Sequence, residues 1–293
     1  MSKAKTDYMV RGIDIGSNFR FFGANTTHLV DVACQKHQTT PVASAALGRT
    51  LTANLMMGGM LKNPDDRVSI IIKGDGPIGG IITEANGDGQ VKGYVYNPQI
   101  ESHLNYLGKL DVGGAVGNAN MTVVKDLGMK EPYSGQVPML TGEIAEDLTY
   151  YFAVSEQTNS VVILGVLVDV DYSIKQAGGV IIQVLPDAKD EAIDALEEKL
   201  KDFGTLTERM EKGQSIEYVI EQLLGRVEYM DTMPVAFHCD CNKDRMERAL
   251  ISVGKKDLAE IIEEDGQAEL VCPFCNDKYV FDKGELEDIA SHL

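Results

Sequence analysis

The sequence predicts an α+β fold: an N-terminal mixed α/β domain with an antiparallel sheet, a helical linker, and a small C-terminal domain that carries four cysteines. Three observations favour this fold. Of the 29 glycines, 23 precede residue 181, as expected where short strands alternate with turns. Of the net charge of −18, residues 181–293 carry −14, and their apolar residues recur at helical spacing. Two closely spaced cysteine pairs near the C-terminus indicate a separate module.

The length of the chain limits the number of domains, and its charge limits the possible partners. The chain has 293 residues, 44% of them hydrophobic, which is enough for about two domains, and we place the boundaries at residues 1–185, 186–232 and 233–293. A net charge of −18 argues against nucleic acid and anionic membranes as partners. No apolar stretch of signal-peptide length follows the polar start, and the longest apolar run, residues 161–168, is too short to span a bilayer. We therefore expect a cytoplasmic protein.

The N-terminal domain opens with two strands and a buried helix. Residues 8–15 and 19–24 have strand composition. Pro41 follows Thr40 as a proline at the first helical position follows an N-cap. The apolar residues beyond it recur at helical spacing: Ala45, Ala46, Leu47, Leu51, Leu55, Met56 and Met60.

An antiparallel meander is predicted next, from apolar runs at residues 68–73, 79–85 and 92–97 that turns separate. Residues 74–79 between the first two runs have the spacing G-x-G-x-x-G of a dinucleotide-binding turn. We interpret them as a hairpin, because a strand follows in place of the helix whose N-terminus would hold a pyrophosphate, and because Pro77 suits a turn.

A helix and two further strands complete this domain. Residues 142–157 have helical propensities, and residues 160–170 and 178–185 read as two buried strands. No acid/base pair, nucleophile elbow or phosphate-binding loop is visible, so we do not expect an enzyme. Cys34 lies three residues before His37, as a nucleophile could before its base, but we expect a small core thiol because cysteine is so often buried.

Two amphipathic helices are predicted in the linker. The first begins at Asp190, and the second runs from Ser215 to Gly225. One face of the first carries four apolar residues: Ile193, Leu196, Leu200 and Phe203. Periodicity leaves two interpretations open, ordinary helices docked on a core or a connector that can detach.

The remaining four cysteines form two pairs, Cys239 with Cys241 and Cys272 with Cys275, separated by 30 residues. Each pair can offer two sulfurs to one ion, and the spacer lets the chain return, as a tetrahedral four-thiolate zinc site requires. Thiolates disfavour magnesium, whereas iron stays possible on spacing alone. Two structural disulfides are the other interpretation, which a reducing cytosol disfavours. His238 is expected to be a neighbour, because a closed four-sulfur site has no fifth position.

The segment "CPFCNDKYVF", with a C-x-C pair about thirty residues upstream, resembles the zinc end of the redox-regulated holdase chaperones of the heat-shock protein 33 family, the 33 kDa chaperonins. The segments "AALGRTLTANLMM", "GDGPIGGIITEANGDGQVKGYV", "TGEIAEDLTYYFAVSEQ" and "AGGVIIQVLPDA" extend the resemblance over nearly the whole chain. Asp240 departs from the small neutral residue that is common inside the first pair. Its charge should slightly disfavour thiolate formation, and Lys243 and Arg245 should oppose that effect.

The resemblance implies an ATP-independent molecular chaperone that binds unfolding proteins under oxidative and heat stress. It implies one Zn2+ per chain, held by the four paired cysteines in a reduced, inactive form. The active form would contain the disulfides Cys239–Cys241 and Cys272–Cys275, would have lost the metal, and would be a homodimer. Unfolding of the linker would then expose the apolar face of its first helix, including Leu196, to client proteins.

Two functions of other classes stay open. A thiol-disulfide oxidoreductase could use Cys272 and Cys275, although such a motif is expected near the start of a βαβ unit. A zinc-ribbon module that binds nucleic acid is the second, although the net charge of −14 over residues 181–293 opposes it.

Overall fold

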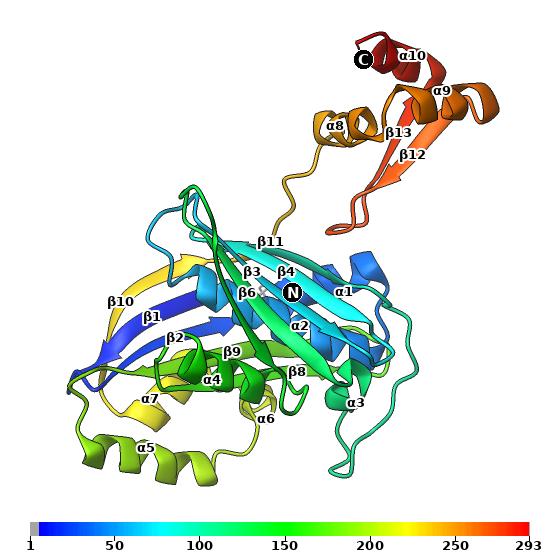
Figure 1. Cartoon of the computed structure of the whole chain (residues 1–293). Helices are drawn as coiled ribbons and strands as arrows, with labels where there is room; N and C mark the ends of the chain where they lie inside the picture. The colour runs from blue at the N-terminus through cyan, green and yellow to red at the C-terminus, as the bar shows by residue number, and fades with distance from the viewer. Residues whose placement is uncertain (1–5, 293) are drawn as a thin grey trace. The chain divides into compact units, whose positions relative to one another are not determined.

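The protein is described here by a computed structural model, which covers residues 6–292 (Figure 1). The chain divides into two compact units, the first ending at His238 and the second beginning at Cys239. The first unit contains two sheets and most of the helices, and the second is a small module of helices and one hairpin. The α+β class expected from the sequence is confirmed.

The first sheet has five antiparallel strands in the order β10-β1-β2-β9-β8. Its strands are β1 (Tyr8–Asp14), β2 (Phe19–Asn25), β8 (Ser160–Val168), β9 (Ile174–Val184) and β10 (Val227–Pro234). Successive side chains of a strand point to opposite faces, and β2 shows the consequence. Phe22 packs into the main core of the unit, whereas Phe21 packs into a second cluster on the other face.

The second sheet has six strands in the order β11-β5-β4-β3-β6-β7. Its strands are β3 (Arg67–Gly74), β4 (Gly80–Asn86), β5 (Gln90–Val95), β6 (Ala119–Asp126), β7 (Tyr133–Pro138) and β11 (Ala236–Phe237). The predicted meander is confirmed as β3-β4-β5. The glycine-rich segment between β3 and β4 is the expected hairpin turn, with Gly74 N–H donating to the Gly79 carbonyl.

Helix α2 (Pro41–Gly58) is the centre of the main core and packs against strands of both sheets (Figure 1). Pro41 occupies its first turn after an extended Thr40, as predicted. Three other helices of this unit are α1 (Thr27–His37), α3 (Val112–Val116) and α4 (Ala145–Val154). Cys34 lies on α1 and is only 4% exposed, so the expected core thiol is confirmed, and burial raises its pKa.

The predicted linker forms three helices: α5 (Asp190–Lys201), α6 (Leu206–Glu211) and α7 (Ile216–Leu224). They cover the face of the first sheet that carries Phe21, opposite the face that packs on α2. Side chains from the helices and from β1, β2 and β9 share this second cluster, which includes Val10, Phe21, Val180, Leu196, Val219 and Ile220.

The end of the predicted helical linker is a strand. Residues 227–234 form β10, which pairs with β1 at one edge of the first sheet. The sequence reasoning assigned residues 186–232 to helices and missed this strand. The extent of the linker remains a prediction, and the break between compact units falls after His238, six residues later than the predicted 233.

The second unit contains three helices and one antiparallel hairpin. These are α8 (Lys243–Val253), α9 (Lys255–Glu264), β12 (Gln267–Val271), β13 (Lys278–Asp282) and α10 (Lys283–Ser291). Its small core consists of Leu250, Leu258, Phe281, Leu286 and Ile289. Within residues 6–292, no helix combines the length and apolar character that crossing a bilayer needs.

Candidate metal centre

The turn of the β12-β13 hairpin positions the second cysteine pair. Cys272 follows β12 directly, and its N–H donates to the Asp277 carbonyl at 3.0 Å. Asn276 N–H donates to the Cys272 carbonyl at 2.8 Å, and Asn276 has φ 59°, a left-handed conformation that asparagine tolerates well. These bonds close a tight turn in which Cys272 and Cys275 are both buried.

The first pair lies between β11 and α8. Asn242 follows Cys241 and caps α8 by accepting the Arg245 N–H at 2.9 Å, which fixes where the extended segment ends. Cys239 and Cys241 are half-buried. All four cysteines belong to the second unit.

The four sulfur atoms converge. All four Sγ atoms lie within 4.8 Å of one another, and His238 is not part of the group. The closest approaches join the two pairs: Cys239 Sγ to Cys272 Sγ is 3.8 Å, and Cys241 Sγ to Cys275 Sγ is 3.2 Å. A tetrahedron with metal–sulfur bonds of about 2.3 Å has edges of about 3.8 Å. The donor set therefore fits a four-coordinate, thiolate-preferring ion such as zinc.

The thiols differ in acidity. Burial raises the pKa of Cys239 to about 12 and also raises the pKa of Cys275. Burial acts in the same direction on Cys241, but hydrogen bonds from Tyr279 and the neighbouring thiols outweigh it and lower the pKa of Cys241. Four thiolates at these distances repel one another, so complete deprotonation requires a cation among them.

Tyr279 contacts the site through its side chain, and the sequence analysis does not identify it. Its hydroxyl lies 3.1 Å from Cys241 Sγ, within hydrogen-bond distance for sulfur. A tyrosine four residues after the last cysteine is visible in the sequence, but only the hairpin register turns it back toward the first pair.

Charged residues around the first pair compensate one another. Asp240 Oδ2 lies 2.7 Å from Arg245 Nη1, as the expected opposition between these charges requires. Lys243 pairs instead with Glu285, and its Nζ lies 5.0 Å from the centre of the Phe281 ring. Arg245 thus forms an ion pair with Asp240 beside the first cysteine pair.

The four apolar residues suggested as a client-binding face are covered in this structure. Leu196 is 4% exposed and Phe203 is 7% exposed, and Ile193 and Leu200 pack against the same cluster on the first sheet. The whole apolar face becomes available to another polypeptide only if α5 and residues 202–203 leave the sheet.

Fold and site together define a class of protein: a two-sheet α+β unit, with helices over one sheet, followed by a small module in which four cysteines can hold a metal ion. A sequence model of the Hsp33 protein family matches residues 7–282. The chain belongs to this family, whose members are the 33 kDa chaperonins, and that membership supports a chaperone function.

Individual relatives match this chain over nearly its full length. The chain is 48% identical over 285 residues to the 33 kDa chaperonin of Bacillus subtilis, covering 97% of this chain and 98% of that one. It is 51% identical over 288 residues to the 33 kDa chaperonin of Alkaliphilus oremlandii, with coverage of 97% and 96%. The crystal structure of the 33 kDa chaperonin from Thermotoga maritima superposes with a TM-score of 0.91 at 35% identity and covers 98% of each chain.

Proposed function

We propose that this protein is a redox-regulated, ATP-independent holdase that binds unfolding proteins and prevents their aggregation under oxidative and heat stress. Cys239, Cys241, Cys272 and Cys275 would hold one Zn2+ per chain in the reduced, inactive form. The observation that carries the proposal is the convergence of these four sulfurs within 4.8 Å. Bound zinc keeps the sulfurs as thiolates and links the two cysteine pairs.

Oxidation would convert the cysteine pairs to the disulfides Cys272–Cys275 and Cys239–Cys241. For each disulfide, two thiolates give two electrons to hydrogen peroxide, a sulfur–sulfur bond forms as the oxygen–oxygen bond breaks, and two protons from solvent complete two water molecules. Each disulfide removes two of the four ligands. Structural zinc contributes about 10–16 kcal/mol in small peptides, which is comparable to the stability of a whole domain.

Chain continuity supplies a path from the cysteines to the linker helices. Phe237 of β11 precedes Cys239 by two residues, and β11 consists of only two residues at the edge of the second sheet. β10, just before it, is an edge strand paired on one side with β1. Loss of order at Cys239 can therefore propagate through the two-residue strand β11 and the edge strand β10 to α7, α6 and α5.

Release of residues 186–232 would uncover both sides of the second cluster, the apolar side chains of the linker helices and those of the first sheet. Ile193, Leu196, Leu200 and Phe203 would be available on the released segment. Phe21 and Val180 would be exposed on the sheet. We propose these surfaces as the client-binding sites of an active homodimer in the cytoplasm, with neither nucleic acid nor membrane as a partner.

The position of Cys272 and Cys275 disfavours a thiol-disulfide oxidoreductase. Reactive C-x-x-C motifs use the N-terminus of a helix to stabilise the thiolate. Here the pair lies in the turn of a two-stranded hairpin, with strands on both sides. Failure of the protein to reduce insulin disulfides would be consistent with this assignment.

Aggregation assays test the function directly. Oxidised protein should suppress aggregation of thermally unfolded citrate synthase without nucleotide, and reduced zinc-loaded protein should not. Equal suppression in both redox states would contradict the switch.

Metal analysis of two serine variants tests the ligand set. Cys34→Ser should retain one zinc per chain, because Cys34 lies on α1 in the first unit. Cys241→Ser should lose most of its zinc. Loss of zinc from the Cys34 variant, or its retention by the Cys241 variant, would contradict the assignment.

A further inference from the structure

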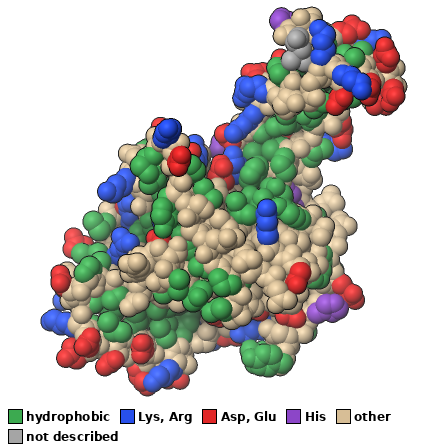
Figure 2. All heavy atoms as spheres, in the orientation of Figure 1, with side chains coloured by type: hydrophobic (Ala, Val, Ile, Leu, Met, Phe, Trp, Pro, Cys, Tyr) green, Lys and Arg blue, Asp and Glu red, His purple; other side chains and the backbone are tan. Residues whose placement is uncertain are grey.

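A loop of the first unit holds three large apolar side chains in solvent. Leu104 is 65% exposed, Tyr106 is 94% exposed and Leu107 is 61% exposed. We refer to these three residues as the apolar tip. The loop is the teal segment that extends beyond α3 in Figure 1, and hydrophobic surface projects at the corresponding place in Figure 2. Exposed apolar side chains that cluster in this way usually mark a contact surface.

The loop is folded by its own backbone. Leu104 and Leu110 form an isolated antiparallel bridge, and Asn105 N–H donates to the Lys109 carbonyl at 2.7 Å. Asn105 Oδ1 accepts the N–H groups of Leu107 and Lys109 at 3.0 and 3.1 Å. The apolar tip is thus presented by a closed turn whose ordering does not have to accompany binding.

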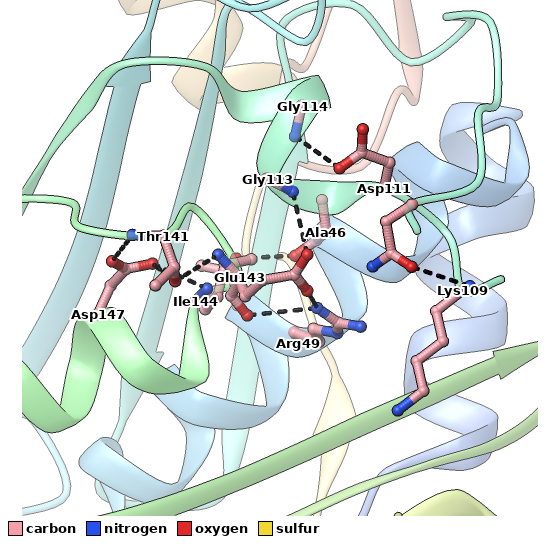
Figure 3. Close-up of polar contacts among 12 residues, drawn as sticks. Ala46, Arg49, Lys109, Asp111, Gly113, Gly114, Thr141, Glu143, Ile144 and Asp147 are labelled. Carbon is pink, nitrogen blue, oxygen red and sulfur yellow. Dashed lines mark hydrogen bonds and ion pairs between the residues drawn. The ribbon is translucent and has the colours of Figure 1, made fainter. Parts of the chain in front are cut away.

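The base of the loop is fixed to the core by charged groups (Figure 3). Asp111 caps α3 by accepting the Gly114 N–H at 2.9 Å. Glu143 accepts the Gly113 N–H at 3.4 Å and pairs with Arg49 of α2 at 2.6 Å. The loop is therefore connected to the central helix of the unit through two interactions of one glutamate.

The residue after that glutamate has a strained backbone conformation. Ile144, the next residue, has φ 71°, which is costly for a β-branched side chain, and it is fully buried. Buried Asp147 maintains this conformation by accepting the N–H groups of Leu140, Thr141 and Ile144 at 2.6 to 3.0 Å. Such strain persists where a particular geometry is needed, and here the residue beside it anchors the loop.

We infer that the apolar tip is a client-contact surface that is available in both redox states and binds an extended apolar segment of an unfolded polypeptide. The inference rests on the chaperone activity of the proposed function, but not on its zinc switch. Unlike the face of α5, the apolar tip is exposed while the four sulfurs are together and α5–α7 are docked. It would supply weak first contact, which the surfaces released by oxidation would strengthen.

Size and charge favour this occupant over a second copy of the chain. Stable dimers bury about 800 Å2 per partner, more than three side chains on a turn can provide. Residues 104–110 contain one lysine and no acidic side chain, in a chain of net charge −18. An apolar segment can approach the tip without meeting a carboxylate on it.

Photo-crosslinking tests the inference. Benzoyl-phenylalanine replaces Tyr106 in one variant and Asp88, exposed in the β4-β5 turn, in a matched control. The probe is reduced, carboxymethylated α-lactalbumin, which stays unfolded and has no free thiol. We expect the Tyr106 variant to crosslink to it at least fivefold more than the control, in both redox states.

Three crosslinking results would overturn the inference: a yield at position 106 no higher than at position 88, crosslinks confined to the oxidised protein, or crosslinks to a second copy in place of the client. Failure of the zinc switch would look different. The oxidised and reduced proteins would then suppress aggregation equally while the Tyr106 crosslinks still formed.

A serine variant measures the contribution of the apolar tip. Leu104→Ser with Leu107→Ser should weaken binding of the same probe by about tenfold, because two leucine contacts are lost. The control is Val170→Ser, 95% exposed in another turn, which should change the Kd less than twofold. Unchanged affinity in the double variant, with its thermal unfolding also unchanged, would overturn the inference.

Discussion

Two tyrosine hydroxyls fasten α7 to the first sheet. Tyr8 of β1 donates to Glu217 at 2.7 Å, and Tyr229 of β10 donates to Glu221 at 3.1 Å. Burial first, and then the hydrogen bond to Glu217, raise the pKa of Tyr8 above its ordinary value of about 10. The protonated hydroxyl is the form that stabilises α7 against the sheet.

Replacing Tyr8 with Phe should destabilise the docked helix by about 1 kcal/mol at neutral pH, because Glu217 loses its donor. A group whose pKa is higher in the folded state stabilises the fold below its unfolded pKa and loses that contribution as pH rises. The difference in free energy of unfolding between wild type and variant should therefore shrink above about pH 10. Urea unfolding at pH 7.5 and pH 10.5 measures this difference.

Tyr218→Phe is the matched control, since Tyr218 is 46% exposed on the same helix. This substitution should leave the midpoints of urea unfolding at pH 7.5 and pH 10.5 unchanged. A stability difference for Tyr8→Phe that grows with pH would contradict the proposed role of the hydroxyl.

At the level of elements, the linker helix α5 depends on a few buried contacts. Leu196 is its one buried residue among the described side chains of α5. Leu196→Ala should cost about 2–3 kcal/mol of docking free energy. The variant should therefore reach full chaperone activity at lower temperature or lower peroxide concentration than wild type.

The control is Glu197→Ala, because Glu197 is the exposed residue next to Leu196 in α5. Activity as a function of peroxide concentration, measured at two temperatures, compares the two variants. An unchanged activation curve for Leu196→Ala would show that undocking of α5 does not limit activation.

The two cysteine pairs should oxidise in order, Cys272–Cys275 before Cys239–Cys241. The second pair already lies in a closed turn, whereas cysteines two residues apart on an extended segment lie near the limit of about 7 Å for Cα separation in a disulfide. The closest sulfur approaches join different pairs, so the proposed pairing requires movement of the first segment. That movement is expected once two ligands are lost.

Alkylation of free thiols during a peroxide time course, followed by peptide mapping, follows the order. Early samples should contain the Cys272–Cys275 disulfide with Cys239 and Cys241 alkylated. The reverse order, or a disulfide that joins one cysteine from each pair, would contradict the prediction.

Helices and strands in which apolar residues recur regularly between clear end signals were predictable from the sequence. α2 has a proline at its start and apolar residues at helical spacing, and β3-β5 are apolar runs separated by turns. The approach of the four sulfurs also followed from spacing, because a metal constrains its ligands more strongly than local propensity constrains a strand.

Elements held by tertiary contacts were missed. α1 has apolar residues at helical positions, but Thr26 makes no side-chain capping bond that would mark its start. The side chains of β10 alternate between partly buried and exposed positions. One inward position is Asp231, which pairs with Arg11 at 3.1 Å, and one outward position is Met230, which is 70% exposed. With a charge at an inward position and a methionine in solvent, apolar and polar residues do not alternate along β10, so its sequence lacks the usual strand pattern. Its partner β1 lies more than 200 residues away in sequence.

At the scale of the whole molecule, the acidic linker helices cover apolar surface that the first sheet cannot hide by itself. The cluster beneath them contains Phe21 and Val180 from strands and Leu196 and Ile220 from helices. These helices end in β10, and the chain then reaches Cys239 after β11. One polypeptide thus connects a cover over apolar surface to a site whose four ligands can be oxidised.

Hydrogen exchange of peptides spanning residues 190–224, with zinc content measured in the same samples, tests this connection most directly. In the reduced, zinc-loaded protein, the amides of α5 and α7 should be protected from exchange. After peroxide treatment, zinc should be released, these amides should exchange within seconds, and suppression of aggregation should increase in proportion. Protection of residues 190–224 in zinc-free, oxidised protein that suppresses aggregation fully would contradict the account.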